Sequence, residues 1–245
     1  MLEVGQRSGV TVLRLCHGKV SALDLELLQA ITAALGEMPE AAPVVITGTG
    51  SAFSAGVDLR RIVAGGPDYA AEFLPALTTA FLAIFDHAGP VVAAVNGHAI
   101  AGGCVIAAAC DVRLMSQGSI GLAELSVGVP FPVSAMEIMR YAVGSAAGRL
   151  ALGAALLDPE GARSIGLVHE VVAPEALLDL AVGQASAMGG TPAEVFSFTK
   201  RQLQQPARER IAARRGDDDA VLARWSSAGT RDRISRYLEQ LRRPR

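Results

Sequence analysis

The stretch PVVAAVNGHAIAGGCVIAAACDVR, residues 90–113, sets the expected fold. Its first part, residues 90–95, is an unbroken apolar run that is typical of a buried strand. Residues 101–109 are mostly small and predict a short buried helix. Between the two lies a turn in which Gly102 and Gly103 place free backbone N–H groups near the start of that helix, a ready site for an anion. The order of strand, glycine turn and helix predicts a layered α/β core.

The same alternation extends on both sides of this stretch and predicts an α/β fold with a helical C-terminal portion. The further strands that we expect are 10–15, 44–47, 112–115, 120–122 and 167–172. The further helices that we expect are 24–38, 69–88, 136–142, 146–152, 159–165, 176–188 and 192–204. The charged tail, residues 208–241, is predicted to be helical apart from breaks at Gly216 and Gly229. We therefore divide the chain into an α/β core, residues 1–190, and a helical assembly region, residues 191–245.

Composition excludes several classes of partner. The 245 residues carry 22 basic and 24 acidic side chains, a net charge of −2, which gives no electrostatic basis for binding nucleic acid or an anionic membrane. The basic end, residues 242–245, is too short to change this expectation. The apolar stretch 90–109 is interrupted by polar residues and glycines, so we do not expect it to span a membrane.

The cysteines indicate a reducing compartment. The chain has three, Cys16, Cys104 and Cys110, an odd and low number that does not suit a disulfide framework. The N-terminus has no basic segment followed by an apolar run, so we expect no signal peptide and a cytoplasmic location. A zinc site from His98 with Cys104 and Cys110 lacks the close ligand spacing of known zinc motifs, and we expect no metal.

Two further segments could carry chemistry. FSAGVDL, residues 53–59, follows a predicted strand and a glycine turn, and its small residues let backbone N–H groups approach a ligand. Glu124 is a lone acid in the apolar run of residues 120–130. Burial there would raise its pKa toward neutrality, as a general base requires. The alternative is an exposed glutamate at a strand edge.

Together these segments resemble the crotonase (enoyl-CoA hydratase/isomerase) family. The family pattern Phe-Ser/Cys-Ala-Gly-x-Asp-Leu matches residues 53–59, Asn-Gly-x-Ala-x-Gly-Gly-Gly matches residues 96–103, and Cys-Asp-x-Arg matches residues 110–113. The one slip is Ala101, at the first of the three glycines. Weaker similarity at residues 19–23 and 163–172 extends the resemblance over residues 8–205. It implies a crotonase-like spiral of ββα units and an acyl-CoA substrate without a further cofactor.

The resemblance also implies roles for individual residues. The backbone N–H groups of Val57 and Gly102 would form an oxyanion hole for the thioester, and Glu124 would be the base. Coenzyme A would lie along residues that are mostly contacted through the backbone, namely Ala22, Ala55, Val57, Asp58, Leu59, Arg60, Gly102 and Gly103. Arg60 and Arg61 are candidates for the CoA phosphates, although both could be plain surface arginines. Asp58 is expected to shape its loop, and helix 69–88 to wall the acyl pocket or to be plain core.

One departure bears on the reaction. Family hydratases carry two glutamates that hold water, and Val105 stands at the position of the first, so we expect 3,2-enoyl-CoA isomerisation with Glu124 as single base. Glu137 is a possible substitute acid, although its helical setting favours a structural role. Hydration of a 2-enoyl-CoA, or CoA-ester binding without catalysis, are the alternatives.

Two other enzyme classes lack their motifs. No Tyr has a Lys four residues later, and no Gly-x-Ser-x-Gly is present, which excludes a short-chain dehydrogenase and a serine hydrolase. The resemblance also implies a homotrimer or a dimer of trimers.

Overall fold

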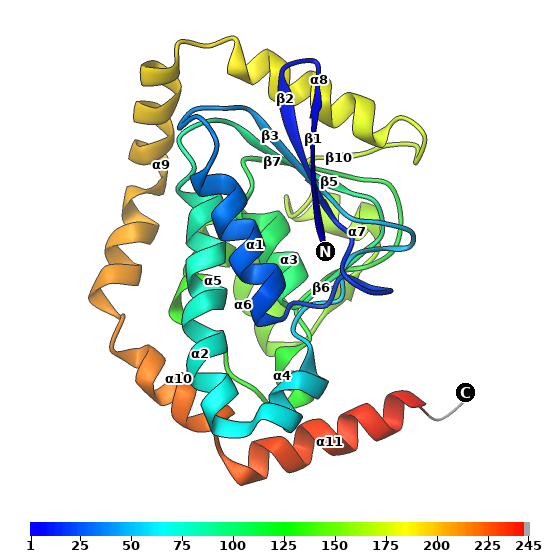
Figure 1. Ribbon diagram of the computed structural model, residues 1–245, viewed down its shortest axis with the longest axis vertical. Helices are drawn as coiled ribbons and strands as arrows, with labels where there is room; N and C mark the ends of the chain where they lie inside the picture. The colour runs from blue at the N-terminus through cyan, green and yellow to red at the C-terminus, as the bar shows by residue number, and fades with distance from the viewer. Residues whose placement is uncertain (243–245) are drawn as a thin grey trace.

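Two sheets form the core of the protein. The computed structural model describes residues 1–242 (Figure 1). The larger sheet has the order β1-β2-β3-β5-β7-β10, and all of its strands are parallel except β1. Its strands are β1 Leu2–Arg7, β2 Val10–Leu15, β3 Val44–Thr47, β5 Val91–Val95, β7 Val112–Met115 and β10 Glu170–Val171. The smaller sheet has the order β4-β6-β8-β9, made of β4 Ala52–Ser54, β6 His98–Ile100, β8 Ile120–Gly121 and β9 Leu156–Leu157.

The chain winds between the two sheets as a spiral of ββα units, which confirms the predicted fold class. Strands β3 and β4 precede helix α2, Leu59–Phe85; β5 and β6 precede α3, Gly102–Ala109; and β7 and β8 precede α4, Glu124–Val127. Strands β4, β6 and β8 are parallel neighbours. Because the carboxyl ends of parallel strands meet at one edge of a sheet, the spiral brings together the segments that follow β4, β6 and β8.

Side-chain alternation along the strands explains the layers. In β5, Val91, Ala93 and Val95 face one side of the sheet, and Val92 and Ala94 face the other. The first set packs in the main core, against α2, α3 and α1, Leu25–Gly36. The second set packs against α8, Leu177–Gly189, which covers the outer face of the sheet (Figure 1). A strand buried on both faces has to be apolar throughout, as residues 90–95 are.

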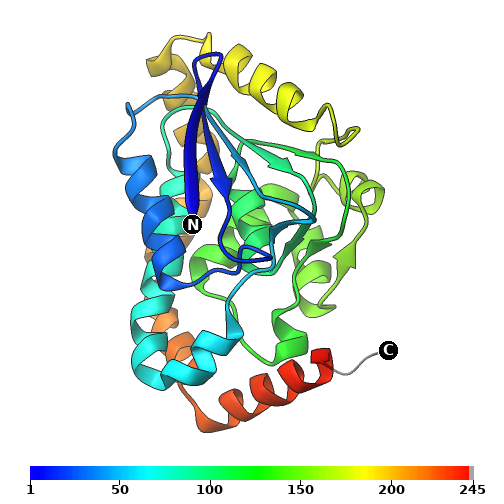
Figure 2. The same cartoon turned by 45° about the vertical axis from the view of Figure 1, so that its right-hand side comes forward.

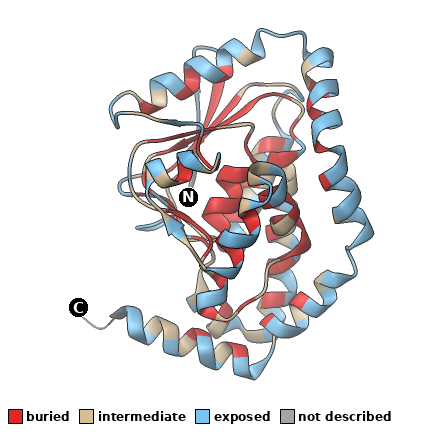
Figure 3. Ribbon diagram, turned by 180° about the vertical axis from the view of Figure 1, so that it is seen from behind, coloured by how far each residue is buried: buried red, intermediate tan, exposed pale blue. Residues whose placement is uncertain are grey.

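The helical half of the chain ends in an arm that wraps around the core. Helices α5, Val133–Val143, α6, Ala146–Leu152, and α7, Pro159–Ser164, complete the core region. The C-terminal arm consists of α9, Ala193–Ala213, α10, Asp217–Trp225, and α11, Ala228–Arg242. Figures 1 and 2 show the arm running along the outside of α2 and then crossing beneath α4. Most of its surface is exposed (Figure 3).

Helix α9 is attached to the core through polar side chains. Lys200 Nζ is buried and donates to Asp111 Oδ2 at 2.8 Å and to the carbonyl of Gly89 at 3.1 Å. Gln204 Nε2 donates to the carbonyl of Phe85 at 2.6 Å. The large apolar side chains of α9 point outward instead, with Phe198 56% and Leu203 62% exposed. The contact therefore depends on directional hydrogen bonds more than on apolar burial.

Several element boundaries differ from the predicted ones. Helix α2 begins ten residues earlier than expected (69 − 59 = 10), because Asp58 caps it by accepting hydrogen bonds from the N–H groups of Arg60 and Arg61. Gly66, with φ 61° and ψ −150°, kinks it. By length and composition α2 could cross a membrane, yet its apolar face lies in the core, where Phe73, Phe81 and Phe85 are buried.

The expected break of the tail at Gly229 is wrong; the chain breaks at Ser226 and Ser227, and Gly229 is helical.

Short strands account for most of the remaining differences. The strand expected over 167–172 is shorter than predicted. Only β10 within it pairs with β7, over two residues. Strands β1, β4, β6 and β9 were not expected from the pattern. Three of these belong to the smaller sheet, whose strands have only two or three residues and leave too short a run for alternation to show. Residues 243–245, the end of the predicted assembly region, lie outside the described residues.

We predict that Lys200→Met destabilises the protein by about 3–5 kcal/mol, because the substitution leaves the carboxylate of Asp111, whose side chain is only 14% exposed, without its cation. Urea unfolding followed by circular dichroism measures the change. The matched control is Arg163→Met, which breaks the exposed ion pair with Glu160 and is expected to cost at most about 1 kcal/mol. Equal losses in the two variants would contradict a structural role for the buried pair.

Candidate active site

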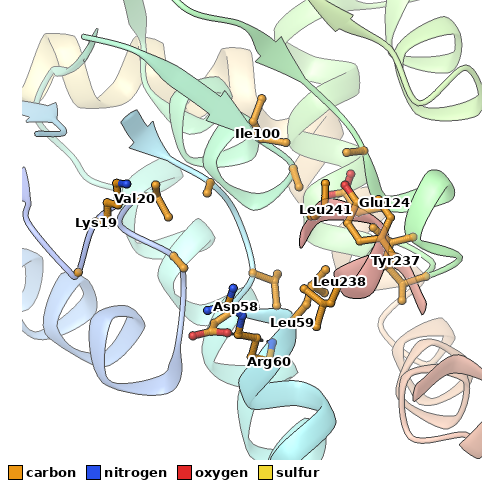
Figure 4. A pocket seen from close by; sticks show the side chains of 18 of the residues that line it. Lys19, Val20, Asp58, Leu59, Arg60, Ile100, Glu124, Tyr237, Leu238 and Leu241 are labelled. Carbon is orange, nitrogen blue, oxygen red and sulfur yellow. Dashed lines mark hydrogen bonds between the residues drawn. The ribbon is translucent and has the colours of Figure 1, made fainter. Parts of the chain in front are cut away.

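A cavity of about 460 Å³ opens where the segments following β4, β6 and β8 meet the C-terminal arm. Figure 4 shows Lys19 and Val20 on one side of this cavity and Glu124, Tyr237 and Leu241 on the opposite side. Its lining is mostly apolar with few polar groups, as is usual for a small-molecule site. The lining residues of the sheet loops and of the arm are Ala22, Ala55, Val57, Asp58, Leu59, Arg60, Ile100, Ala101, Ala123, Glu124, Val127, Val129, Trp225, Tyr237, Leu238 and Leu241.

The loop after β4 presents the N–H group of Val57. Val57 forms an isolated parallel bridge with Leu23, in which Leu23 N donates to the carbonyl of Gly56 at 2.7 Å and Asp58 N donates to the carbonyl of Leu23 at 2.8 Å. Residues alternate in such a bridge, so the N–H of Val57 points away from Leu23. Within residues 1–242 this N–H donates no hydrogen bond. It is therefore free to meet a ligand.

The turn after β6 presents the N–H group of Gly102 at the start of α3. Ala101 N donates to the carbonyl of Gly121 at 2.8 Å, which ties this turn to β8. Ala101 has φ 54° and ψ −122°, a left-handed conformation that costs a residue with a Cβ about 1–3 kcal/mol. The N–H of Gly102 likewise has no acceptor among the described residues. A strained residue directly before a free amide is typical of a functional turn.

The two turns are in close contact. A Cβ built on Gly56, which has φ 80°, would lie 2.6 Å from the carbonyl oxygen of Ile100 and 3.2 Å from the amide nitrogen of Gly102. Only glycine fits at this point. A Cβ on Gly102 would lie 2.8 Å from Leu23 and 3.9 Å from Cγ2 of Val57. The segments that carry the two free amides therefore pack directly against each other.

Glu124 is the first residue of α4 and lies in the same cavity. Its side chain is buried, and Oε2 has no hydrogen-bond partner in the described part of the chain. Burial away from water raises the pKa of this carboxyl to about 7, against small opposing effects of the backbone N–H groups of Glu124 and Ala123. A carboxyl group with this pKa can give up or take a proton near neutral pH.

The predicted CoA-contacting residues divide into two groups. The first group lines the cavity and consists of Ala22, Ala55, Val57, Asp58, Leu59 and Arg60. Gly102 and Gly103 are buried and do not line the cavity, and a Cβ on Gly103 would lie 2.4 Å from the carbonyl oxygen of Ser54. Gly103 thus serves close packing between α3 and β4.

The cationic side chains at or next to the cavity differ in whether the protein itself supplies their ion-pair partners. Arg61 donates to both carboxylate oxygens of Glu26 at 2.9 Å and lies over the ring of Tyr69 at 5.2 Å. Arg60 and Lys19 are exposed at the cavity and form no ion pair with a described residue. Arg61 is therefore held by the protein itself, while Arg60 and Lys19 remain available to an anionic ligand.

The structure decides between alternatives that the sequence left open for two other features. Glu137 has the structural role that its helical setting favoured, because its buried carboxylate accepts from Arg210 Nε at 2.6 Å, pairs with Arg140 and does not line the cavity. The phenylalanines of the predicted helix 69–88 are core, and of α2 only Leu59 and Arg60 line the cavity. Val105 is buried in that same core.

The sequence interpretation did not place the C-terminal arm in the site. Trp225, Tyr237, Leu238 and Leu241 close one side of the cavity beside Glu124 (Figure 4). The signal that could have revealed them is their spacing. Three of them stand at i, i+1 and i+4 in an otherwise charged helix, and such an apolar stripe requires a surface to cover.

Comparisons of sequence agree with this geometry. The family model described as Enoyl-CoA hydratase/isomerase matches residues 5–244. The human protein named enoyl-CoA delta isomerase 1, mitochondrial, is 26% identical over 254 residues, which cover 99% of this chain and 83% of the relative. A putative enoyl-CoA hydratase of Thermus thermophilus is 32% identical over 185 residues, which cover 74% of this chain and 73% of the relative.

Solved structures give the same result. The crystal structure of the human mitochondrial delta3-delta2-enoyl-CoA isomerase superposes with a TM-score of 0.92 at 25% identity, covering 98% of this chain and 97% of that one. A probable enoyl-CoA hydratase of Mycobacterium tuberculosis gives a TM-score of 0.83 at 28% identity, covering 89% of this chain and 94% of that one. With the match of the family model over nearly its whole length, the chain belongs to the enoyl-CoA hydratase/isomerase family and is an enzyme of the crotonase superfamily.

Proposed function

We propose that this enzyme converts a 3-enoyl-CoA into a 2-enoyl-CoA. The carboxylate of Glu124 takes a proton from C2 of the thioester, which leaves an enolate. The same carboxyl then returns the proton to C4, and the double bond moves from C3–C4 to C2–C3. No water is added and no atom is lost, so one base and one anion-stabilising site are enough.

The free N–H groups of Val57 and Gly102 support the enolate step. Both belong to turns that are rigidly packed against each other, and neither has an acceptor in the described structure. Donors that are held in place before the reaction need no reorganisation when charge develops on the thioester oxygen. One such donor contributes about 3 kcal/mol to the transition state.

The environment of Glu124 supports its role as the base. The carboxyl lies in an apolar cavity beside Val127 and Val129, and burial raises its pKa to about 7. At neutral pH a substantial fraction is ionised and can accept a proton, and the acid that forms is strong enough to give it back. Transfer in both directions by one group is what double-bond migration requires.

The observation that carries the proposal is that Glu124 is the one cavity-lining carboxyl of residues 1–242 without a structural partner. The other carboxyl at the cavity, Asp58, caps α2. The position where family hydratases have their first glutamate holds Val105, and Glu137 is paired with arginines. Among the described residues that line the cavity no second free carboxyl stands ready to hold a water molecule with Glu124, as the paired glutamates of family hydratases would, which favours the isomerase over the hydratase.

The orientation of the substrate follows from the two sides of the cavity. We propose that the pantetheine arm enters along Ala22 and Ala55, and that Lys19 and Arg60 meet the phosphates of coenzyme A. The acyl chain then extends toward the apolar side that Val127, Trp225 and Tyr237 form. This placement leaves the thioester between the free amides and the carboxyl.

We further propose that residues 191–242 serve assembly into a homotrimer or a dimer of trimers. Helix α9 exposes Val195, Phe198 and Leu203, although its buried face is polar. Apolar side chains that gather on an exposed helix face are typical of subunit contacts.

We also propose that the protein works in a reducing compartment such as the cytoplasm. Its cysteines Cys104 and Cys110 are buried free thiols, which supports this location.

Glu124→Gln is predicted to lower kcat for 3-enoyl-CoA isomerisation by about 10²–10⁴-fold, because the amide cannot accept the proton. Acyl-CoA binding, measured by calorimetry, should change by less than about threefold, because the amide keeps the shape of the side chain. The matched control is Glu137→Gln, which alters the other buried glutamate and should leave the turnover of folded enzyme near that of the wild type.

The same assay distinguishes the alternatives when a 3-enoyl-CoA and a 2-enoyl-CoA are supplied side by side. Rapid hydration of the 2-enoyl ester without migration of the 3-enoyl double bond would assign the protein as a hydratase. Binding of both esters without turnover, with no change in that binding in Glu124→Gln, would assign the protein as a CoA-ester-binding protein without catalysis.

Glu124→Gln should also stabilise the protein in a pH-dependent way. The pKa is about 7 in the folded state against an ordinary value of 4.5, so well below pH 4.5 both states are protonated and ionisation makes no difference to wild-type stability. Between these values the unfolded state loses its proton first, and the wild type loses up to about 3 kcal/mol as pH rises to 8. The stability of the variant relative to the wild type should therefore grow from pH 4 to pH 8 in urea unfolding. Glu40→Gln, at an exposed position, is the control and should show no such trend.

A further inference from the structure

The segment that carries Glu124 has little structure of its own. Helix α4 is only four residues long and is followed by Gly128-Val129-Pro130-Phe131-Pro132 before α5 begins at Val133. The N–H groups of Gly128 and Val129 close α4 by donating to the carbonyl of Glu124 at 2.9 and 3.1 Å. The two prolines have no N–H group to donate. Contacts from elsewhere must therefore hold this segment, which we call the Glu124 segment, residues 124–133.

Helix α10 supplies two of these contacts. Trp225 is buried, and its Nε1 donates to the carbonyl of Pro130 at 2.9 Å. Asp218 Oδ1 accepts from the N–H of Val133 at 2.9 Å and so caps α5, whose own N-cap residue, Pro132, makes no side-chain cap bond. One hydrogen bond lies in the middle of the loop and the other at its end, and both come from one helix.

Helix α11 supplies a third contact and the cover over the carboxyl. Gly128 has φ 84°, and a Cβ built on it would lie 2.7 Å from Nε of Arg233. Tyr237, Leu238 and Leu241 line the cavity beside Glu124 (Figure 4). The arm therefore touches the backbone on one side of the Glu124 segment and shields its carboxyl on the other.

We propose that Trp225 and Asp218 are positioning residues that hold the base Glu124 in place through Pro130 and Val133. The inference rests on the function proposed above. The C-terminal arm is then part of the catalytic apparatus as well as of any assembly. A shift of about 1 Å at a reacting group can cost as much as 10²-fold in rate, so a segment with few hydrogen bonds of its own needs such support.

The protonation of Glu124 depends on the same contacts. Burial raises its pKa, and the arm contributes to that burial. Ionisable groups on the elements packed around it include the thiol of Cys104 in α3, the hydroxyl of Tyr237 and the guanidinium of Arg233 in α11, and the exposed guanidinium of Arg149 in α6. Loosening the segment would let water reach the carboxyl and would lower the pKa of Glu124.

Two substitutions test the proposal. Trp225→Phe keeps an aromatic ring but removes the N–H that binds Pro130, and Asp218→Ala removes the cap on α5. We expect each to lower kcat for 3-enoyl-CoA isomerisation by about tenfold with KM changed less than about twofold, because placement of the base affects the chemical step. The acid limb of the pH profile of kcat/KM should move to lower pH in both variants.

Controls separate positioning from plain stability. Asp217→Ala alters the neighbouring residue in the same first turn of α10, where Asp217 only pairs with the exposed Arg214, and it should behave as the wild type. Asp218→Asn keeps an oxygen acceptor and should restore most of kcat. A lower melting temperature with wild-type kcat and an unchanged pH profile in both Trp225→Phe and Asp218→Ala would overturn the proposal.

A wild-type enzyme without isomerase activity would refute the proposed function but would leave this inference open to a direct measurement. Carbon-13 NMR of labelled glutamate, with the Glu124 signal assigned by its loss in Glu124→Gln, reports the pKa of this carboxyl without turnover. A lower pKa in Trp225→Phe and Asp218→Ala than in the wild type would support the coupling. The same pKa in all three proteins would overturn it.

Discussion

The site depends on the close packing of two backbone turns. Gly56 approaches the carbonyl of Ile100 so closely that a Cβ would lie 2.6 Å from its oxygen. This contact fixes the turns after β4 and β6, which carry Val57 and Gly102, against each other. The amides of both residues are donors without an acceptor among the described residues, so they are available to a ligand.

A second constraint is the removal of water from the carboxyl of Glu124. The spiral places this residue after β8, beside the two turns, but the sheets alone leave that side of the cavity open. The C-terminal arm closes it with Tyr237, Leu238 and Leu241. The main-chain geometry and the apolar cover therefore come from opposite halves of the chain, and the site exists only where they meet.

Much of this could be predicted from sequence, and the limits have physical reasons. The strands 10–15, 44–47 and 112–115 match β2, β3 and β7, because each is a short, mostly apolar run bounded by turn residues. The expected runs 120–122 and 167–172 contain β8 and β10 but extend beyond them, and β9 was missed, because a paired segment of two residues is too short for a period to show. The glycines before α3 indicated free N–H groups near Gly102 because their spacing is local, whereas the role of Val57 followed from the resemblance to the family. The contributions of Trp225 and Asp218 depend on where a distant helix lies in space, which no local pattern reports.

The polar attachment of α9 has a mechanical consequence. About 20 Å of helix separate Lys200 from the end of α9 at Ala213, at 1.5 Å per residue. A tilt of about 5° at the anchor would therefore displace the start of α10 by about 2 Å over that length. Helix α9 is held against such a tilt at three points beyond Lys200, where Gln204 binds the carbonyl of Phe85, Arg208 pairs with Asp86 and Arg210 pairs with Glu137. The start of α10, and with it Trp225, is therefore fixed in position by the core.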